Sequence, residues 1–194
     1  MFNGIIFNKG IIKSIKKSTS STYIEISTDI VFKKKELGSS VCCNGVCLTV
    51  DKIINKSIFF YLSYETLKKS NFRLAKLGDQ INLEKSLIYG KDISGHYTQG
   101  HVDSTGLIKN IKIIDKTWFI KIEVNTKFKD FIIEKGSISI NGVSLTITKI
   151  VKNVFEISII PHTLKLTNLI NLKINSTVNL EYDIFGKYII KLKK

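Results

Sequence analysis

Short runs of β-branched and aromatic residues, separated by polar turns, recur along the whole chain. Their number and spacing predict an all-β barrel or sandwich. The runs are Ile5–Phe7, Thr22–Ser27, Ser57–Leu62, Gln80–Glu84, Trp118–Val124, Val154–Ile159 and Thr177–Tyr182. Two pairs, Asn44-Gly45 and Asn141-Gly142, are each flanked by alternating apolar residues. Because Asn and Gly tolerate the positive φ of a tight type I′ turn, each pair predicts a hairpin.

Three segments have helical rather than strand patterns. Residues 65–70 and 161–166 each follow a strand, and Pro161 suits the first turn of a helix. The last segment, residues 184–194, has apolar residues at helical spacing. They are Ile184, Phe185, Tyr188, Ile189 and Leu192. Because short apolar tails often make oligomer contacts, we expect an oligomerisation helix here.

The chain is an internal duplication. Leu37–Val50 and Lys135–Ile147 both contain Asn-Gly-Val-x-Leu-Thr followed by a β-branched residue, with an offset of 142 − 45 = 97 residues. Further pairs at an offset of 96 or 97 are Gly4/Gly100, Gly10/Gly106, Thr66/Thr163, Asn71/Asn168 and Glu84/Glu181. Two copies of one domain of roughly 90 residues explain this pattern. We therefore expect domains at residues 1–95 and 96–183, followed by the helix.

Composition narrows the class of protein. The 194 residues are 43% hydrophobic, enough for two small cores. We find no apolar run of about 20 residues and no signal peptide at the start, so no membrane association is expected. Three cysteines within six residues do not make a disulfide framework. A cytoplasmic location is expected.

The formal net charge of +14 raises nucleic-acid binding as an alternative function. Of the 30 basic residues all but Arg73 are lysines (30 − 1 = 29), and they are scattered. Recognition of bases and phosphates favours Arg for its planar fork. A barrel for single-stranded nucleic acid also needs aromatic residues interleaved with basic ones along a groove, and no such stripe is visible. We expect no nucleic-acid partner.

Alternation along the second arm of each hairpin places small polar groups on one strand face. These are Cys47 and Thr49 in the first copy and Ser144 and Thr146 in the second. They indicate either two equivalent ligand-binding surfaces or two strand faces that are partly exposed to water. The cysteines do not predict a zinc site, because the second copy has Ser139, Ile140 and Ser144 at the matching positions. No metal is expected.

A histidine follows the junction between the copies. His101 and Asp103 are placed by alternation on one strand face, and a His beside a carboxylate can transfer protons near neutral pH. The alternative is a His satisfied by a neighbour at the junction. The counterpart of His101 is Ile5, and that of Cys47 is Ser144. A duplicated enzyme could use such differences to give its two sites different chemical roles.

Five motifs together resemble the riboflavin synthase alpha chain family across essentially the whole chain. They are Met1-Phe-x-Gly-Ile-Ile6, Ser40-Val-x-x-Asn-Gly-Val-Cys-Leu-Thr49, Gly95-His-x-x-Gln-Gly-His-Val-Asp103, Lys135-Gly-Ser-Ile-x-Ile-x-Gly-Val-Ser-Leu-Thr146 and Ile160-Pro-His-Thr-Leu164. Asn3 and Ser94 depart from the family's usual Thr and Gly.

The resemblance implies two tandem six-stranded antiparallel Greek-key β-barrels and a C-terminal helix through which three chains associate. It implies that each barrel binds one 6,7-dimethyl-8-ribityllumazine, with the productive site between the N-terminal barrel of one chain and the C-terminal barrel of a neighbour. The reaction implied is a dismutation to riboflavin and 5-amino-6-(D-ribitylamino)uracil without a separate cofactor. It also raises lumazine synthase as a partner.

The family's site residues carry over position by position. The first-barrel pocket would comprise Gly4, Ile5, Ile6, Cys47, Leu48, Thr49, Tyr61, Leu62, Ser63, Tyr64, Glu65 and Thr66. The second-barrel pocket would comprise Gly100, His101, Val102, Lys135, Ser144, Leu145, Thr146, Ile160, Pro161, His162, Thr163, Leu164 and Lys165.

Catalytic roles follow from the same resemblance. His101 would assist proton transfer, and Ser40 and Cys47 would activate the acceptor ring. Asp183 would orient groups or relay protons. Phe2 would pack on a ring, while Ser144 and Thr146 would hydrogen-bond the donor ring. A non-catalytic lumazine- or flavin-binding relative is the nearest alternative, but it is expected to lose site residues in one barrel.

Overall fold

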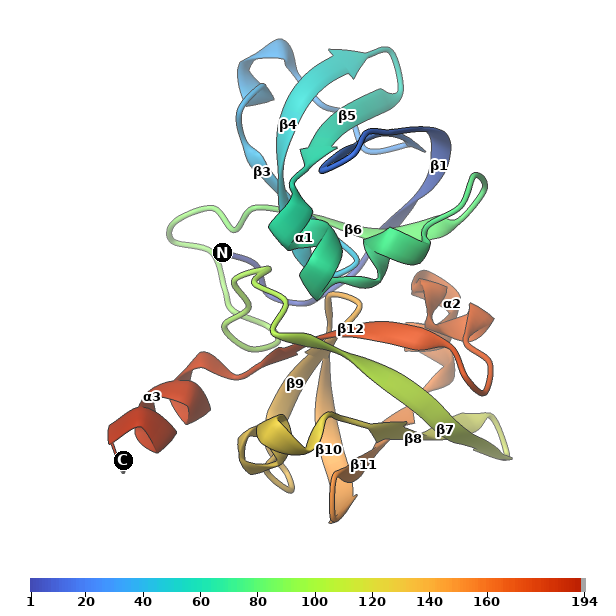
Figure 1. Cartoon of the computed structure of the whole chain (residues 1–194), viewed down its shortest axis with the longest axis vertical. Coiled ribbons are helices and arrows are strands. Elements are labelled where there is room, and N and C mark those ends of the chain that lie inside the picture. The colour runs from blue at the N-terminus through green and yellow to red at the C-terminus, as the bar shows by residue number, and fades with distance from the viewer. Residues whose placement is uncertain (193–194) are drawn as a thin grey trace.

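In the computed structural model, which describes residues 1–192, twelve strands form two closed barrels stacked along the long axis of the molecule (Figure 1). The first barrel has the strand order β1-β2-β5-β4-β3-β6, with antiparallel neighbours. Because β2 lies beside β5 rather than β3, this is a Greek-key arrangement. Its strands are β1 Asn8–Lys17, β2 Thr22–Thr28, β3 Ser40–Cys43, β4 Val46–Ile54, β5 Ser57–Leu62 and β6 Gln80–Lys85.

The second barrel repeats this topology as β7-β8-β11-β10-β9-β12. Its strands are β7 Ser104–Ile114, β8 Thr117–Glu123, β9 Ser137–Ile140, β10 Val143–Val151, β11 Val154–Ile159 and β12 Thr177–Tyr182. Strand number n of the first barrel corresponds to strand n + 6 of the second. The predicted fold of two six-stranded antiparallel barrels with a C-terminal helix is confirmed.

Short helices and 3₁₀ turns lie between the strands, and one helix follows the last strand. The α-helices are α1 Tyr64–Lys69, α2 Pro161–Leu166 and α3 Ile184–Leu192. The 3₁₀ turns are η1 Lys34–Glu36, η2 Asn71–Leu74, η3 Thr126–Phe131 and η4 Asn168–Asn171. The Ser63 hydroxyl accepts a hydrogen bond from the Thr66 amide and starts α1, whereas Pro161 starts α2. None of the helices in residues 1–192 has the length and apolar character needed to cross a membrane.

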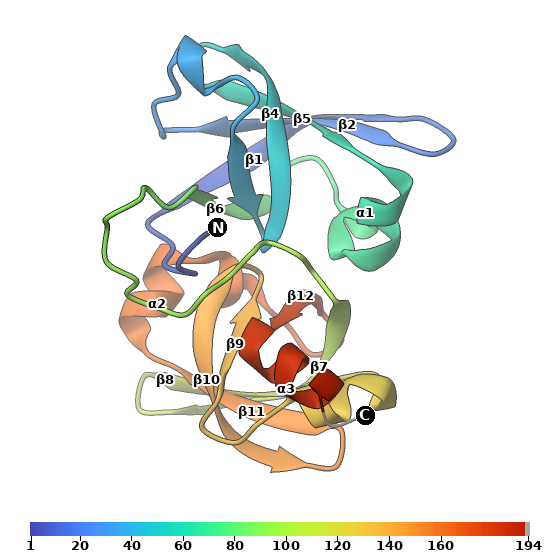
Figure 2. The same cartoon turned by 90° about the vertical axis from the view of Figure 1, so that its left-hand side faces the viewer.

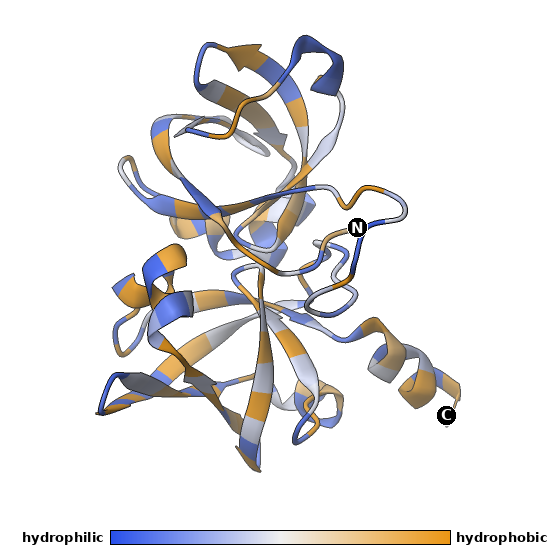
Figure 3. Ribbon diagram, turned by 180° about the vertical axis from the view of Figure 1, so that it is seen from behind, coloured by the Kyte–Doolittle hydropathy of each residue, from blue (hydrophilic) through white to orange (hydrophobic). Residues whose placement is uncertain are grey.

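Side-chain alternation builds each core. In β2, for example, Thr22, Ile24, Ile26 and Thr28 point inward and the residues between them do not. Figure 3 shows hydrophobic and hydrophilic residues alternating along the strands of both barrels. Both Asn-Gly turns have positive φ at their two residues, as the hairpin prediction required.

The segments that precede β1 and β7 depart from the prediction. Ile5–Phe7 does not form a strand. Residues 101–103 do not form one either, so the prediction that His101 and Asp103 share a strand face is wrong. Instead these two segments cross to the other barrel. Ile6 is buried in the core of the second barrel, and Val102 packs against the core of the first. The N-terminus accordingly lies between the barrels (Figures 1 and 2).

Equivalent residues meet where the barrels join. The Phe2 amide donates to the Thr98 carbonyl at 2.8 Å, and the Thr98 amide donates back at 3.2 Å. The Asn82 side-chain amide donates to the Asn141 carbonyl at 2.9 Å, and that of Asn179 donates to the Asn44 carbonyl at 2.8 Å. The two halves are therefore related by an approximate twofold axis through these contacts.

Candidate functional site

Two adjoining cavities on the first barrel share Cys47 and Thr66. One, of about 280 Å³, lies between α1, the start of β4 and residues 100–102 of the crossing segment that precedes β7. The other, of about 470 Å³, lies along β4 and the end of β5 and is also lined by Thr49, Tyr61 and Ser63. Together they form a groove that we call the first-barrel groove. Thr49 and Tyr61 are exposed in it, and Cys47 is half-buried.

The backbone of Gly100 seats the crossing segment against β4. The Cys47 amide donates to the Gly100 carbonyl at 2.7 Å, and Gly100 has φ +75°. A Cβ at Gly100 would lie 2.7 Å from the Cβ of Cys47, so only glycine fits this approach. As a result, His101 is exposed on the wall of the first-barrel groove, beside Cys47 and Glu65.

A buried carboxylate from the second barrel fixes the same segment. Glu181 on β12 accepts hydrogen bonds from the Gln99 amide at 2.7 Å and the Gly100 amide at 2.9 Å. Burial raises the pKa of Glu181, while these amides and Lys187 act in the opposite direction. The loop that carries His101 is therefore held between β4 of one barrel and β12 of the other.

The other half repeats the arrangement. Glu84 accepts from the amides of Asn3 at 2.8 Å and Gly4 at 3.0 Å. The Ser144 amide donates to the Gly4 carbonyl at 2.8 Å, and a Cβ at Gly4 would lie 2.8 Å from the Ser144 Cβ. Burial raises the pKa of Glu84 to about 6 despite its amide donors. Residues 4–6 thus belong with β10 of the second barrel.

The two predicted pockets are therefore grouped wrongly. Gly100, His101 and Val102 lie with Cys47 on the first barrel, and residues 4–6 lie with Ser144 on the second. Each crossing segment leaves its own barrel, and a repeat alignment does not reveal which copy it contacts. Glu84 and Glu181 were not recognised as site residues; the Asn-Leu-Glu triplet that ends in each of them is repeated, but it fits a strand equally well.

A second histidine lies beside Ser144 of β10. We call the region formed by Ser144 and residues 4–6 the second-barrel site. Nδ1 of His96 is 2.7 Å from the Ser144 hydroxyl, and His96 is buried. Burial lowers the pKa of His96, which favours the neutral ring, and the nearby charge of Asp183 partly opposes this effect. In the sequence, His96 stands out only as part of the Gly95–Asp103 motif, with no site role assigned to it. The contact with Ser144 places it next to a predicted ligand residue.

The remaining predicted residues are spread around these two regions. Leu145 is half-buried and Thr146 exposed on β10, while Ile160, Pro161, His162 and Lys165 are exposed at α2. Lys135 is exposed at the turn before β9. Leu62 and Leu164 are buried in the two cores, and Phe2 is buried at the junction.

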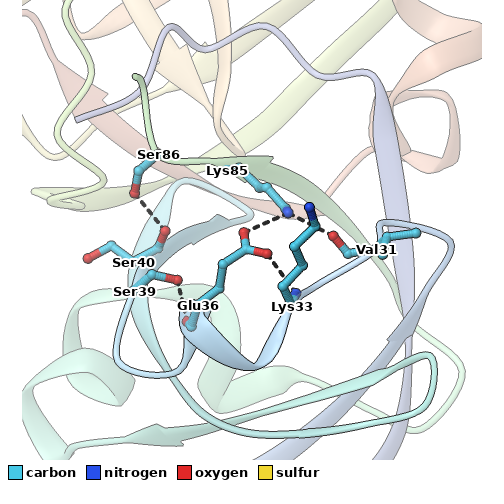
Figure 4. Close-up of polar contacts among 7 residues, drawn as sticks. All are labelled: Val31, Lys33, Glu36, Ser39, Ser40, Lys85 and Ser86. Atoms are coloured by element: carbon cyan, nitrogen blue, oxygen red, sulfur yellow. Dashed lines mark hydrogen bonds and ion pairs between the residues drawn. The ribbon is translucent and has the colours of Figure 1, made fainter. Parts of the chain in front are cut away.

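Ser40 and Asp183 make local structural contacts. The Ser40 carbonyl accepts from the Ser86 hydroxyl at 2.7 Å (Figure 4), and Ser40 pairs with Thr49 in the β3–β4 ladder. The Asp183 carboxylate accepts from the Phe185 amide at 2.9 Å at the start of α3. Ser40 does not line either cavity of the first-barrel groove.

Comparison with known proteins identifies the class that this fold and site define. Residues 3–86 and 99–183 each match the model of the lumazine binding domain family. The chain is thus a tandem lumazine-binding barrel protein.

Full-length relatives narrow this class. The chain is 37% identical to riboflavin synthase of Photobacterium leiognathi over 100% of this chain and 89% of the relative. It is 40% identical to that of Actinobacillus pleuropneumoniae, over 97% and 88%, and 32% identical to that of Bacillus subtilis, over 98% and 89%. The chain belongs to the riboflavin synthase family.

Solved structures agree with the fold. The structure of LumP complexed with riboflavin superposes with a TM-score of 0.83 at 28% identity, covering 94% of this chain and 99% of LumP. LumP complexed with 6,7-dimethyl-8-(1'-D-ribityl) lumazine superposes with a TM-score of 0.81 at 27% identity, covering 93% and 98%.

Proposed function

We propose that the chain is a riboflavin synthase that converts two molecules of 6,7-dimethyl-8-ribityllumazine into riboflavin and 5-amino-6-(D-ribitylamino)uracil. One lumazine donates a four-carbon unit to the other. The full-length relation to riboflavin synthases supports this activity. The observation that carries it is the chemical difference between two equivalent sites: the first-barrel groove contains Cys47 and His101, and the second-barrel site contains Ser144 and Ile5.

The side chains of each site fit a distinct part of this reaction. One lumazine ring must lose a proton from its C7 methyl group, and the resulting carbanion must add to the other ring. His101 is exposed in its groove and can exchange protons with a bound ring. Cys47 lies beside it and can act on the same ring as a nucleophile or hydrogen-bonding group. We assign Ser144 and Thr146 to the ring held by the second barrel.

Two bound rings must also be brought face to face, and holding them so can supply much of the rate. Each chain has its two sites on different barrels, so we propose that the first-barrel groove of one chain closes on the second-barrel site of a neighbour in a homotrimer. Helix α3 supports this assembly, because Phe185, Tyr188 and Leu192 are 65%, 63% and 86% exposed. An apolar helix face of this kind is stabilised when it packs against copies of itself.

A turnover assay tests the activity. Pure protein mixed with 6,7-dimethyl-8-ribityllumazine should produce one riboflavin and one uracil product without added cofactor. His101→Ala should reduce turnover by about 10²-fold or more, whereas Asn110→Ala, on an exposed part of β7, should not. Full turnover by His101→Ala would remove His101 from the mechanism.

A concentration series separates the enzyme from a binding protein. If the shared site forms only in the trimer, specific activity should rise with protein concentration in parallel with the amount of trimer measured by sedimentation. Tight lumazine binding without turnover at any concentration would favour the alternative of a non-catalytic lumazine-binding protein.

We propose a cytoplasmic location, supported by the three free thiols of Cys42, Cys43 and Cys47. Lumazine synthase is the proposed protein partner. Sedimentation of a mixture of the two proteins should show a joint species, and independent sedimentation would exclude this partner.

A further inference from the structure

We propose that an ion pair between helix α3 and the crossing segment of residues 99–103 positions His101, so that the first-barrel groove is fully formed only when α3 is docked. The residues of this pair are Lys187 and Asp103. They position His101 and do not act on the substrate themselves. The inference rests on the proposed function, because it concerns the groove to which we assign one lumazine.

The geometry of the pair is tight and partly shielded. Nζ of Lys187 is 2.6 Å from Oδ2 of Asp103, and both side chains are 22% exposed. The same oxygen accepts a hydrogen bond from the Tyr182 amide at 3.0 Å. The Asp103 amide donates to the Leu180 carbonyl, also at 3.0 Å. Asp103 is therefore held by β12 and by α3 at once.

His101 lies between two anchors of the crossing segment. On one side, Gly100 is held by Cys47 and Glu181; on the other, Asp103 is held by β12 and Lys187. Only Val102 separates His101 from Asp103. Because a misplacement of about 1 Å can cost about 10²-fold in rate, the second anchor matters for the position of the imidazole.

The charges around the segment require a cation. Glu181 and Asp103 are two carboxylates close enough for the charge of Asp103 to raise the pKa of Glu181, and the charge of Lys187 lowers it. Without Lys187, the described residues would leave this carboxylate pair without its cationic partner. Repulsion between like charges would then push the segment away from β12.

The pair is present only in the half that carries the histidine. The counterpart of Asp103 is Phe7 (103 − 96), which is 70% exposed, and Lys187 lies beyond the repeat, whose two copies end at residues 86 and 183. The other features of the crossing segments, including the glycine and the carboxylate, occur in both halves. The ion pair and His101 are thus two differences found on the same segment.

Helix α3 is otherwise lightly attached to its own chain. It leaves the end of β12 and projects from the second barrel (Figures 1 and 2), touching the barrel beside η3. The exposed apolar face of α3 is the surface proposed for assembly. A movement of α3 on assembly would therefore act on Asp103 through Lys187.

The test compares four lysine variants. Lys187→Met removes the pair. Lys191→Met changes an exposed lysine of the same helix, and Lys85→Met breaks an ion pair of 2.7 Å with Glu36 on the first barrel (Figure 4). We expect Lys187→Met to lower kcat at least tenfold at protein concentrations where it sediments like the wild type, and the two controls to change kcat less than threefold. Lys187→Arg, which keeps a cation beside Asp103, should retain kcat within about threefold of the wild type.

A second measurement does not depend on activity. Hydrogen exchange of the amides of residues 99–103 should become at least tenfold faster in Lys187→Met and stay unchanged in Lys85→Met. If exchange and kcat in Lys187→Met match those of Lys191→Met, the inference is wrong. If the wild type forms no riboflavin, the proposed function is wrong, and the exchange measurement still decides whether the ion pair holds the segment.

Discussion

At the scale of single residues, two glycines fix the relation between the barrels and their sites. Gly4 and Gly100 have φ +73° and +75°, and each presses its backbone against the first residue of a site strand face, Ser144 or Cys47. Adding a side chain at either position would therefore cost free energy in two ways. It would strain the left-handed backbone, and it would produce a steric clash.

Replacing Gly100 by Ala should separate these costs. Gly38 has φ +79° with open space around its Cβ position, so Gly38→Ala should lose only about 1 kcal/mol of unfolding free energy. Gly100→Ala should lose about 2–4 kcal/mol, because the new methyl group meets Cys47. Urea unfolding measures both values. Equal losses would show that the close approach to Cys47 costs nothing.

The buried carboxylate of Glu84 makes stability depend on pH. Burial raises its pKa from 4.5 to about 6, so between these values the folded chain binds more protons than the unfolded chain. The contribution of Glu84 is present below pH 4.5 and is lost as pH rises through about 6. This loss amounts to about 2 kcal/mol.

Unfolding by urea at pH 4.5 and pH 7, for the wild type and Glu84→Gln, measures this contribution. The variant should be weakened at both pH values because it loses one acceptor for the amides of Asn3 and Gly4. However, its stability should fall less with pH than that of the wild type. Identical pH dependence of the two proteins would contradict the raised pKa.

Residue types and spacing predicted which strand faces are exposed better than they predicted which segments meet there. Alternation placed Cys47 and Ser144 on polar strand faces, and the comparison of copies singled out His101. The identity of the segment beside each strand depends on crossings between barrels, which arise from tertiary contacts and leave no periodic pattern. Glu84 and Glu181 fit a strand as well as a site, so their position alone did not mark them.

At the scale of elements, the contact between hairpin turns is built from side-chain amides. Asn179 is 1% exposed; its amide nitrogen donates to the Asn44 carbonyl, and its oxygen accepts from the Asn71 amide at 2.7 Å. Each of these bonds joins the two barrels. The same bonds occur with the roles of the halves exchanged, through Asn82.

Asn179→Ala should therefore destabilise the whole chain. The substitution leaves the carbonyl of the buried Asn44 and the backbone amide of the half-buried Asn71 without these partners, at a cost of about 1–3 kcal/mol each. We expect a total loss of about 2–4 kcal/mol in urea unfolding, against less than about 0.5 kcal/mol for the exposed Asn110→Ala. A small loss in Asn179→Ala would mean that water replaces both partners.

Elements with strong local signals were predicted closely. The Asn-Gly turns, Pro161 at the start of α2, and the helical spacing of α3 are each determined within a few residues. Ile5–Phe7 was wrongly predicted as a strand because its apolar residues do mark a buried position. Ile6 is buried, but in the core of the other barrel. The local sequence pattern predicts that a residue is buried, but it does not predict which element the residue packs against.

At the scale of the whole molecule, each barrel is completed by the other half's leading segment. Ile6 contributes to the core of the second barrel and Val102 packs against that of the first. The duplication in the sequence predicted two similar barrels, but two independent barrels would have produced the same repeat.

A chain of residues 1–95 should consequently associate in pairs. Its residues 1–7 would have no second barrel to contact, and the Gly4 carbonyl of one copy could accept from the Cys47 amide of another, as Gly100 does here. Sedimentation should show a dimer, and removal of residues 1–7 should give a monomer. A monomer formed by residues 1–95 would show that the crossing segment folds back onto its own barrel.

The exchange of leading segments also suggests how the protein arose. Two identical single-barrel chains, each lending its first residues to the other, would make a closed symmetric pair, and joining them end to end would preserve every contact of the present junction. In such an ancestor a change at one site was necessarily a change at both. Once the genes were fused, one copy could acquire a histidine at position 101 while the other kept an isoleucine at position 5. Two copies joined in one chain can therefore differ at corresponding positions while the fold that holds them stays the same.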